Sequence, residues 1–383
     1  MDLASAWRDE FPGLARSTYL NTCSLGQLPR RGIAAAEEFQ ERWMSLGASA
    51  WYEIWVEQVE TLRRQYASLI GARPTEVAWV PNVSVALSAI ASCIDYEDRP
   101  DVVLSEMEFP TVAYQWLVRP EAHVRWVQSR DRVRVPVEDY ASQITEATAV
   151  VAASRVFYTS GYLQDVAALA KAAHAKGALL LVDDYQATGQ VPIDVHAADV
   201  DVLVGGSLKW LLGGIGSCFL YVRQDLVERM SPRVVGWWGN KHMFDFDATR
   251  FAYRPEARRF ETGEIGMPSV AYASAGASIV QEIGPATIRR ATLALATDLV
   301  ERAEDAKLVV KSPERPDERT GIVMIELPDP KKAVKHLAQR GIVVDDRPGR
   351  LRISPYFYNT VAENERIVDA LVSGGFRDAA RRA

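Results

Sequence analysis

The sequence contains few cysteines. Its 383 residues include only Cys23, Cys93 and Cys218, which lie far apart and form no C-x-x-C pair. An odd number of widely spaced cysteines argues against a disulfide-stapled scaffold and against a structural zinc site. We therefore expect a protein of a reducing compartment, the cytoplasm, with no metal site.

The sequence also lacks the features of nucleic-acid-binding and membrane proteins. Acidic residues outnumber basic ones by 50 to 44, which gives a formal net charge of −6, whereas a nucleic-acid partner usually requires a basic face. No apolar run approaches the roughly 18 residues of a membrane span. The N-terminus lacks a basic start followed by an apolar segment, so it does not resemble a secretion signal. We expect neither nucleic acid nor membrane as a partner.

Short apolar runs alternate with helical patterns between about residues 75 and 223. The runs include residues 101–104, 149–153 and 178–182. This order is typical of an α/β fold in which helices wrap a mainly parallel sheet. After about residue 270, a helix-rich stretch leads into shorter strand patterns of a small α+β unit.

The chain is too long for one simple core, so we expect two domains that share an interface. The predicted large domain spans residues 18–268, and the predicted small C-terminal domain spans residues 269–383. Residues 1–17 are expected to form an N-terminal segment that packs on the small domain.

Two charged residues follow two of the apolar runs. Asp183 comes directly after residues 178–182, and Lys209 follows the run 202–204 and two glycines. Ligands of parallel sheets bind at the carboxyl ends of the strands, so an acid and an amine are expected at one cleft edge. Most such acids only cap a turn, and most lysines are solvated. A lysine among glycine and apolar residues can instead be desolvated, and its lowered pKa then suits Schiff-base chemistry.

The residues around these two positions resemble one enzyme family. The order V-D-x-x-Q-x-x-G, followed by G-S-x-K-W, is similar to the class V aminotransferase family of pyridoxal 5′-phosphate (PLP) enzymes. The resemblance implies the PLP-dependent transferase fold of type I, with Lys209 as the catalytic residue that forms the Schiff base. It also implies that Asp183 pairs with the protonated pyridine nitrogen and Gln186 with the phenolic oxygen. Ser207 is implied as a further cofactor contact.

Two more segments extend the resemblance to the rest of the cofactor. Ser84 follows the strand pattern 76–81 and could simply cap the next helix. In the family this position cradles the phosphate, so Val83 would contribute its N–H, and Ser84 its N–H and hydroxyl. Phe109 could be a core residue, but the triplet F-P-T resembles the kynureninase segment whose Phe stacks on the PLP ring.

Two later segments imply a shared active site. The stretch G-W-W-G-N at 236–240 and the stretch R-R-F-E-T-G at 258–263 resemble kynureninase and family segments that reach the phosphate of a neighbouring subunit. By that resemblance Trp237 and Thr262 bind the partner's cofactor, and a homodimer is expected.

The substrate is expected to carry a carboxylate. Strand alternation places Arg350 and Arg352 on one face, where they could form surface ion pairs or grip a carboxylate. The run R-I-S-P-Y-F-Y-N resembles the family motif that holds the substrate-carboxylate arginine, which corresponds to Arg352. Asn21 and Cys23 lie in a stretch similar to the start of kynureninases, although those enzymes carry Asn where Cys23 stands. An amino acid or amino-acid-like substrate follows from the resemblance.

The type of reaction is the property that the sequence determines least. The loops are most similar to kynureninases and to isopenicillin-N-epimerase-like members, but Leu208, Gln186 and Val112 depart from kynureninase polar positions. Residues 341–350 lack the nucleophilic cysteine that a cysteine desulfurase needs. We expect aminotransferase-type chemistry, with a kynureninase-like hydrolase, a C–S or C–C lyase, or an epimerase as alternatives. A non-catalytic regulator on a PLP-enzyme fold is the alternative from another class.

Overall fold

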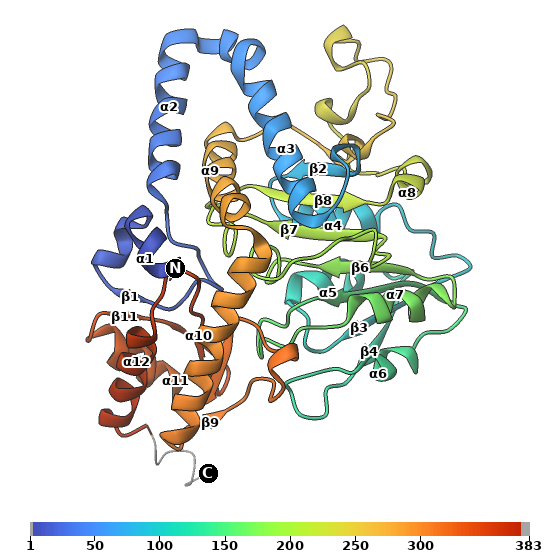
Figure 1. The fold of residues 1–383 in the computed structure, drawn as a ribbon. Helices are drawn as coiled ribbons and strands as arrows, with labels where there is room; N and C mark the ends of the chain where they lie inside the picture. The colour runs from blue at the N-terminus through green and yellow to red at the C-terminus, as the bar shows by residue number, and fades with distance from the viewer. Residues whose placement is uncertain (1–2, 377–383) are drawn as a thin grey trace.

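A seven-stranded sheet forms the centre of the molecule (Figure 1). The computed structural model describes residues 3–376. The strand order is β2-β8-β7-β6-β5-β3-β4. The strands are β2 (Val77–Val80), β3 (Asp101–Ser105), β4 (His123–Val127), β5 (Thr148–Ser154), β6 (Leu179–Asp183), β7 (Val202–Gly206) and β8 (Cys218–Val222). Strands β3 to β7 run parallel, which confirms the expected α/β fold with a mainly parallel sheet.

Each face of this sheet packs against its own set of helices. Alternate residues of one strand point to opposite faces, so Val103 belongs to one apolar core, whereas Val102 and Leu104 belong to the other. The first core includes residues of α3 (Val56–Ile70), α7 (Val166–His174) and α9 (Met267–Ile283). The second includes residues of α4 (Val83–Ala91), α5 (Pro110–Leu117) and α8 (Gln224–Arg229). Burial on both faces explains the continuous apolar runs of the central strands.

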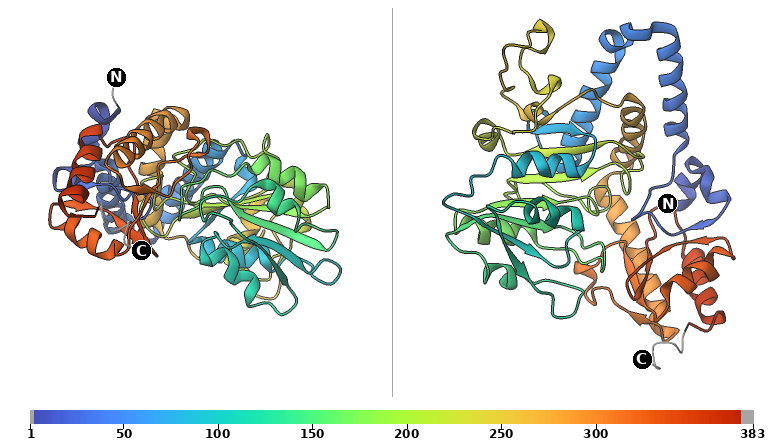
Figure 2. Two further views of the ribbon diagram at one scale, coloured as in Figure 1. Left: turned by 90° about the horizontal axis from the view of Figure 1, so that it is seen from below. Right: turned by 180° about the vertical axis from the view of Figure 1, so that it is seen from behind.

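A second, antiparallel sheet lies in the C-terminal part of the chain, with the order β12-β13-β10-β9. Its strands are β9 (Val309–Val310), β10 (Val323–Glu326), β12 (Asp345–Arg347) and β13 (Arg350–Ile353). The helices α10 (Pro285–Asp305), α11 (Pro330–Ala338) and α12 (Val361–Ser373) belong to the same part of the chain. In both views of Figure 2 the red C-terminal elements lie beside the blue N-terminal segment.

Pairing between distant segments explains this neighbourhood. Strand β1 (Thr18–Tyr19) pairs in parallel with β11 (Ile342–Val343), and Arg8 forms an ion pair of 2.9 Å with Glu363. The domain limits at residues 17 and 268 stay predictions. Within residues 3–376, no helix combines the length and the apolar character needed to cross a membrane.

Three strands go beyond what the sequence predicts. Strand β8 runs antiparallel to β7 and to β2, because the loop that carries Lys209 turns the chain straight back. Strand β4 was not predicted, because it is an edge strand whose residues are mostly exposed and therefore form no apolar run. Strand β12 was not predicted either, because its three residues are all charged.

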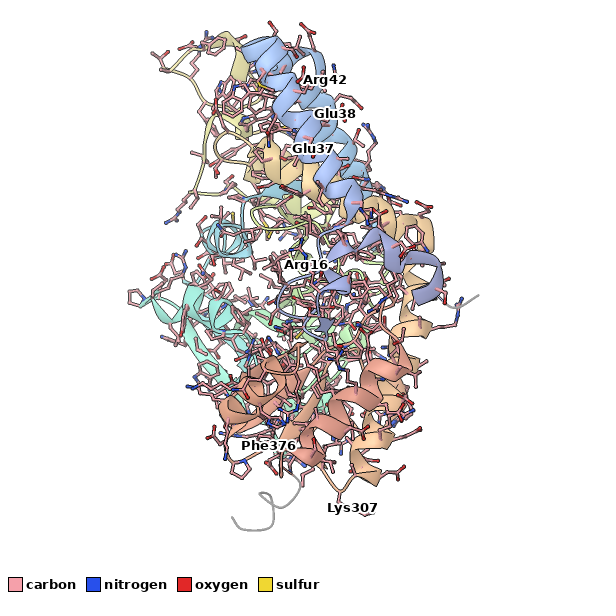
Figure 3. All side chains as sticks on the ribbon, turned by 90° about the vertical axis from the view of Figure 1, so that its left-hand side faces the viewer. Arg16, Glu37, Glu38, Arg42, Lys307 and Phe376 are labelled. Carbon is pink, nitrogen blue, oxygen red and sulfur yellow. The ribbon has the colours of Figure 1, made fainter. Side chains whose placement is uncertain are left out.

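Two long helices project from the sheet at the top of Figure 1. They are α2 (Arg30–Leu46) and α3, joined by a π-helical turn at Trp51–Trp55. Glu37, Glu38 and Arg42 lie along the outer side of α2 (Figure 3). Exposed aromatic side chains of α2, of the π-helical turn and of a later loop form what we call the aromatic tip: Trp43, Tyr52, Phe244 and Phe246. The Tyr52 and Phe244 rings lie 6.4 Å apart, which connects the loop to the helices.

Candidate active site

A cavity of about 240 Å³ opens at the carboxyl ends of the parallel strands. Residues that follow five strands of the large sheet line it, as expected where parallel strands end together. Six of the predicted site residues are among them: Val83, Ser84, Phe109, Asp183, Gln186 and Lys209. The sequence-predicted cofactor residues of the large sheet are therefore brought together, apart from Ser207.

Lys209 places a desolvated amine in this cavity. Its Nζ lies 4.5 Å from the centre of the Tyr185 ring and 5.9 Å from that of Phe109, and it has no hydrogen-bond partner within residues 3–376. Burial lowers the pKa of the amine to about 8, although the Asp183 carboxylate opposes this shift. An amine with this pKa is partly neutral at physiological pH, which a nucleophile or general base requires.

Asp183 ends strand β6 and presents a buried carboxylate to the same cavity. Oδ1 accepts the Tyr185 N–H at 2.9 Å, whereas Oδ2 has no hydrogen-bond partner within the described part of the chain. Burial raises the pKa of this carboxyl to about 6. Because Asp183 lines the cavity, Oδ2 is available to accept a hydrogen bond from a ligand.

The N-terminus of α4 forms another wall of the cavity. Asn82, not Ser84, caps this helix, because the Asn82 side chain accepts the Val85 N–H at 3.0 Å. Ser84 lies in the first turn instead, and its hydroxyl is 3.4 Å from the Thr111 hydroxyl across the cavity. The capping expectation for Ser84 was wrong, since the residue just before the helix caps it. A helix N-terminus with two hydroxyls beside it is suited to bind a phosphate.

Gln186 and Ser207 have hydrogen bonds within the chain. The Gln186 amide donates to the Cys23 carbonyl at 3.0 Å and accepts from the Trp210 indole at 2.9 Å. Its remaining N–H is the group that a ligand in the cavity could use. The Ser207 hydroxyl is fully buried and donates to the Ser217 carbonyl at 2.8 Å. A cofactor contact of Ser207 therefore has no support from the geometry of the cavity.

Arg352 is almost fully buried and already paired. Its guanidinium donates to both carboxylate oxygens of Asp345, at 2.8 and 2.6 Å, and to the Ser24 hydroxyl at 2.6 Å. Its Nη1 donates to the carbonyl of Tyr158, a residue whose side chain lines the cavity. The pairing leaves one Nη1 hydrogen without an acceptor within residues 3–376. Arg352 thus lies beside the cavity, fixed by Asp345.

The two N-terminal candidates lie behind the lysine loop and not in the cavity wall. Cys23 is buried, and its N–H donates to the Ser354 hydroxyl at 3.0 Å. Asn21 forms a parallel bridge with Ser354. The same segment reaches Lys209 through Gly26, where a Cβ would lie 2.2 Å from the Lys209 carbonyl oxygen. The segment therefore supports the lysine loop.

Trp237 and Thr262 lie beside each other but outside the cavity of this chain. The Trp238 N–H donates to the Thr262 carbonyl at 3.2 Å, and the Trp237 indole donates to the Met243 carbonyl at 2.6 Å. The resemblance implies that both reach the cofactor of a second subunit, so their place outside this cavity is compatible with that expectation.

Several residues of the site were not predicted. Thr111, Ser154, Tyr158 and Tyr185 line the cavity. Behind it, the buried Glu108 accepts hydrogen bonds from the Ser154 N–H and hydroxyl at 2.7 and 2.5 Å. Each of these residues lies at or shortly after the end of a strand, and the sequence could have indicated them by that position.

Asp345 was missed for a different reason, since it lies in the hairpin β12–β13. Its position opposite Arg352 could have been found from the turn dipeptide Pro348-Gly349, because a two-residue turn there sets the register.

Comparison with known proteins decides the family. The sequence profile described as aminotransferase class-V matches residues 18–366. The chain belongs to the class V aminotransferase family. A protein described as the uncharacterized aminotransferase YcbU of Bacillus subtilis is 34% identical over 97% of this chain and 98% of its own. A kynureninase of Pseudomonas fluorescens is 28% identical over 87% of this chain and 82% of its own.

Solved structures show the same fold in other PLP enzymes. The apo cysteine desulfurase of Thermococcus onnurineus NA1 superposes with a TM-score of 0.87, at 20% identity over 97% of this chain and 98% of that one. A variant of C-DES with glycine covalently linked to its PLP cofactor superposes with a TM-score of 0.88, at 19% identity over 95% and 98% of the two chains. At such identities these similarities establish the type I fold alone.

PLP is the cofactor of this class V family member, and the residues of the cavity fit it. The Asp183 carboxylate has an oxygen without a partner within residues 3–376, and this oxygen would accept the pyridinium N–H. The Lys209 amine lies in the same cavity, and Ser84 with the start of α4 would hold the phosphate. Phe109 would supply a flat surface for the ring.

The pKa of Lys209 predicts how cofactor loading depends on pH. Only the neutral amine attacks an aldehyde, and below a pKa of about 8 its fraction falls about tenfold per pH unit. The initial rate at which PLP reacts with the cofactor-free protein should therefore rise up to about pH 8 and then level off. Absorption during mixing at constant ionic strength measures this rate. Nα-acetyl-lysine is the control, because its rate should keep rising toward the ordinary pKa of 10.5. A flat profile for the protein would contradict the expectation.

Proposed function

We propose that this class V family member is an aminotransferase-type enzyme that acts on an amino acid. The observation that carries the proposal is the desolvated Lys209 amine in one cavity with the buried, partly unpartnered Asp183 carboxylate. Bound PLP supplies the electron sink for the negative charge that develops at the substrate α-carbon. The chain has to bind the amino acid, hold that carbon near Lys209 and move its proton.

The residues of the cavity divide these tasks. With PLP bound, Lys209 Nζ would be the base that takes the proton from the substrate α-carbon and the acid that gives it back. Asp183, ionised above about pH 6, would keep the ring nitrogen protonated. Arg352 binds the substrate carboxylate with its available Nη1 hydrogen and gains a second donor if the Ser24 hydroxyl moves aside.

A half-reaction assay tests the proposal. The PLP-loaded protein is mixed with single amino acids, and both the 2-oxo acid and pyridoxamine 5′-phosphate are measured by chromatography. We expect at least one amino acid to yield the two products in equal amounts. If the whole panel gives no pyridoxamine 5′-phosphate, transamination is not the activity.

Replacement of Arg352 separates amino-acid chemistry from the alternatives that do not use an α-carboxylate. In Arg352→Ala we expect the dissociation constant of a bound amino acid to rise at least about tenfold, because a charge-assisted pair is lost. The cofactor absorption band should persist, and titration of that band measures the constant. Arg352→Lys should recover part of the affinity. An unchanged constant in Arg352→Ala would favour a regulator or a sugar-amine enzyme.

Kynureninase-type hydrolysis is the second candidate, supported by relatives of 27 to 29% identity that carry that name. Two positions speak against it. Leu208 lines the cavity but has no polar group to offer to a phosphate, and Val112 is fully buried where kynureninases carry an acid. Incubation with kynurenine distinguishes the two activities, because hydrolysis releases anthranilate and alanine without consuming the aldehyde form of PLP.

We further propose that the enzyme works as a homodimer in a reducing, cytoplasmic setting. The aromatic tip exposes Trp43 to 61% and Tyr52 to 72%, and such exposed aromatic groups mark association surfaces. Trp237 stacks on Phe246 of this tip at 5.8 Å, so the surface is continuous with a residue expected to reach the partner's phosphate. Analytical ultracentrifugation at micromolar concentration tests the proposal, and a monomer carrying full activity would overturn it.

A further inference from the structure

One face of the hairpin β12–β13 carries four charged side chains. Asp345 lies directly opposite Arg352, and Arg347 lies directly opposite Arg350. Because side chains alternate along a strand, these two cross-strand pairs share one face of the hairpin. Three guanidinium groups and one carboxylate therefore point the same way, toward the loop after β5. Arg350 and Arg352 donate there to the carbonyls of Thr159 and Tyr158.

Arg347 and Arg350 place two positive charges directly opposite each other. Like charges directly opposite each other on neighbouring strands are destabilising. The Asp345 carboxylate mainly neutralises the charge of Arg352, because both of its oxygens accept hydrogen bonds from that guanidinium. One of the two oxygens also accepts a hydrogen bond of 3.3 Å from Arg347 Nη1. The excess positive charge on this face is consistent with an anionic ligand.

A second cavity, of about 290 Å³, adjoins this face. Arg132, Arg347 and Arg350 line it, and its one acidic lining residue is Glu106, whose carboxylate accepts the Ser129 N–H at 3.1 Å. Tyr158 lines both this cavity and the PLP cavity. A ligand that extends past Tyr158 would therefore pass from the reacting amine to the three arginines.

Arg347 is the cation placed to meet such a ligand. Its guanidinium lies 5.7 Å from the centre of the Tyr158 ring, and that ring lies 5.3 Å from the ring of Phe109. Its Nη1 donates to the Asp346 carbonyl at 2.6 Å, whereas Nε and Nη2 have no hydrogen-bond partner within residues 3–376. The Nε–Nη2 edge is the fork that binds a carboxylate with two parallel hydrogen bonds.

We propose that Arg347 determines specificity by binding the second carboxylate of a dicarboxylic amino acid. This inference rests on the proposed function, since it assigns the substrate class of the same site. Arg352 takes the carboxylate next to the reacting carbon, and Arg347 takes the distal one beyond Tyr158. Arg132 and Arg350 add positive charge, while Glu106 and Asp345 oppose it; the cationic groups on this wall outnumber the two acids.

Binding measurements on matched pairs of amino acids test the assignment. The PLP-loaded enzyme is titrated with aspartate and asparagine, with glutamate and glutamine, and with 2-aminoadipate and norleucine, and the shift of the cofactor band gives each dissociation constant. We expect one diacid to bind at least about tenfold more tightly than its amide, or, for 2-aminoadipate, than norleucine. In Arg347→Gln this ratio should fall below about threefold. Arg315→Gln removes an exposed arginine paired with Asp317 and should retain the wild-type ratio.

Each outcome has one interpretation. Ratios near one for every pair in the wild-type enzyme overturn the inference, whether or not Arg347→Gln folds. A tenfold ratio that Arg347→Gln retains assigns the distal carboxylate to another group and also overturns it. If no amino acid shifts the cofactor band, the result contradicts the proposed aminotransferase-type function, and with it the role of Arg347 that rests on that function. A selectivity that falls from about 0.05 to 0.5 M salt in the wild-type enzyme supports a charge-based origin independently of the variant.

Discussion

Replacing Lys209 with alanine should lower turnover at least about a thousandfold. In the proposed mechanism the change removes both the nucleophile that links PLP to the protein and the base that moves the α-proton, and a positioned general base alone contributes about 10² to 10⁴. Among the described residues that line the cavity, Lys209 is the one amine, so no second lysine can take over this role. Turnover of the best amino acid, together with mass spectrometry after borohydride reduction, measures both losses.

The matched control is Lys176→Ala. Lys176 is exposed and pairs with Glu146 on the surface, and surface pairs contribute about 0–1 kcal/mol. This variant should keep turnover and the covalent label. If borohydride still fixed PLP to Lys209→Ala as efficiently as to the wild type, another lysine would be the attachment site.

Asp183→Asn should lower turnover about a hundredfold or more while the protein stays folded. Asparagine is isosteric and can still accept the Tyr185 N–H, but its neutral side chain could not keep the ring nitrogen protonated as we propose for Asp183. Removal of one preorganised electrostatic contact typically costs about 10² to 10³ in rate. Steady-state kinetics at saturating PLP measure the loss, and thermal unfolding verifies the fold. Turnover within about threefold of the wild type would refute the role of Asp183.

The adjacent acid provides the contrast. Asp184 is fully buried and forms an ion pair with Arg155 instead of facing the cavity. Asp184→Asn leaves Arg155 without its partner, which should cost about 3–5 kcal/mol of unfolding free energy. Turnover per folded molecule should stay at the wild-type value. The variant of Asp183 should therefore lower the rate, whereas the variant of Asp184 should lower only the stability.

Most of the cofactor site could be predicted because it depends on local order along the chain. Apolar runs fix the strands, and in a parallel sheet each strand delivers the next residues to the same edge. Asp183 and Lys209 therefore meet, although 26 positions separate them in the sequence. Phe109 and Ser84 follow two other strands and reach the cavity for the same reason. The roles of these residues toward a ligand stay predictions.

The helix cap and the strand direction could not be predicted where two structures fit the same residues equally well. Asn82 and Ser84 are both good capping residues, and the backbone at Asn82, which is extended, decides that this residue is the cap. The direction of β8 depends on how the loop 207–217 turns, and strand patterns carry no direction.

The family, the cofactor and the strand ends that carry Asp183 and Lys209 could all be predicted from the amino-acid sequence. The surroundings of Arg352 depend on how distant segments pack. That arginine could have been a solvated surface group, but the hairpin turn at Pro348-Gly349 sets Asp345 opposite it, and docking on the Tyr158 carbonyl buries the guanidinium. The same register sets Arg347 opposite Arg350. Such pairs arise from register and from contact between distant segments, whereas strands and their ends arise from periodicity that each segment carries alone.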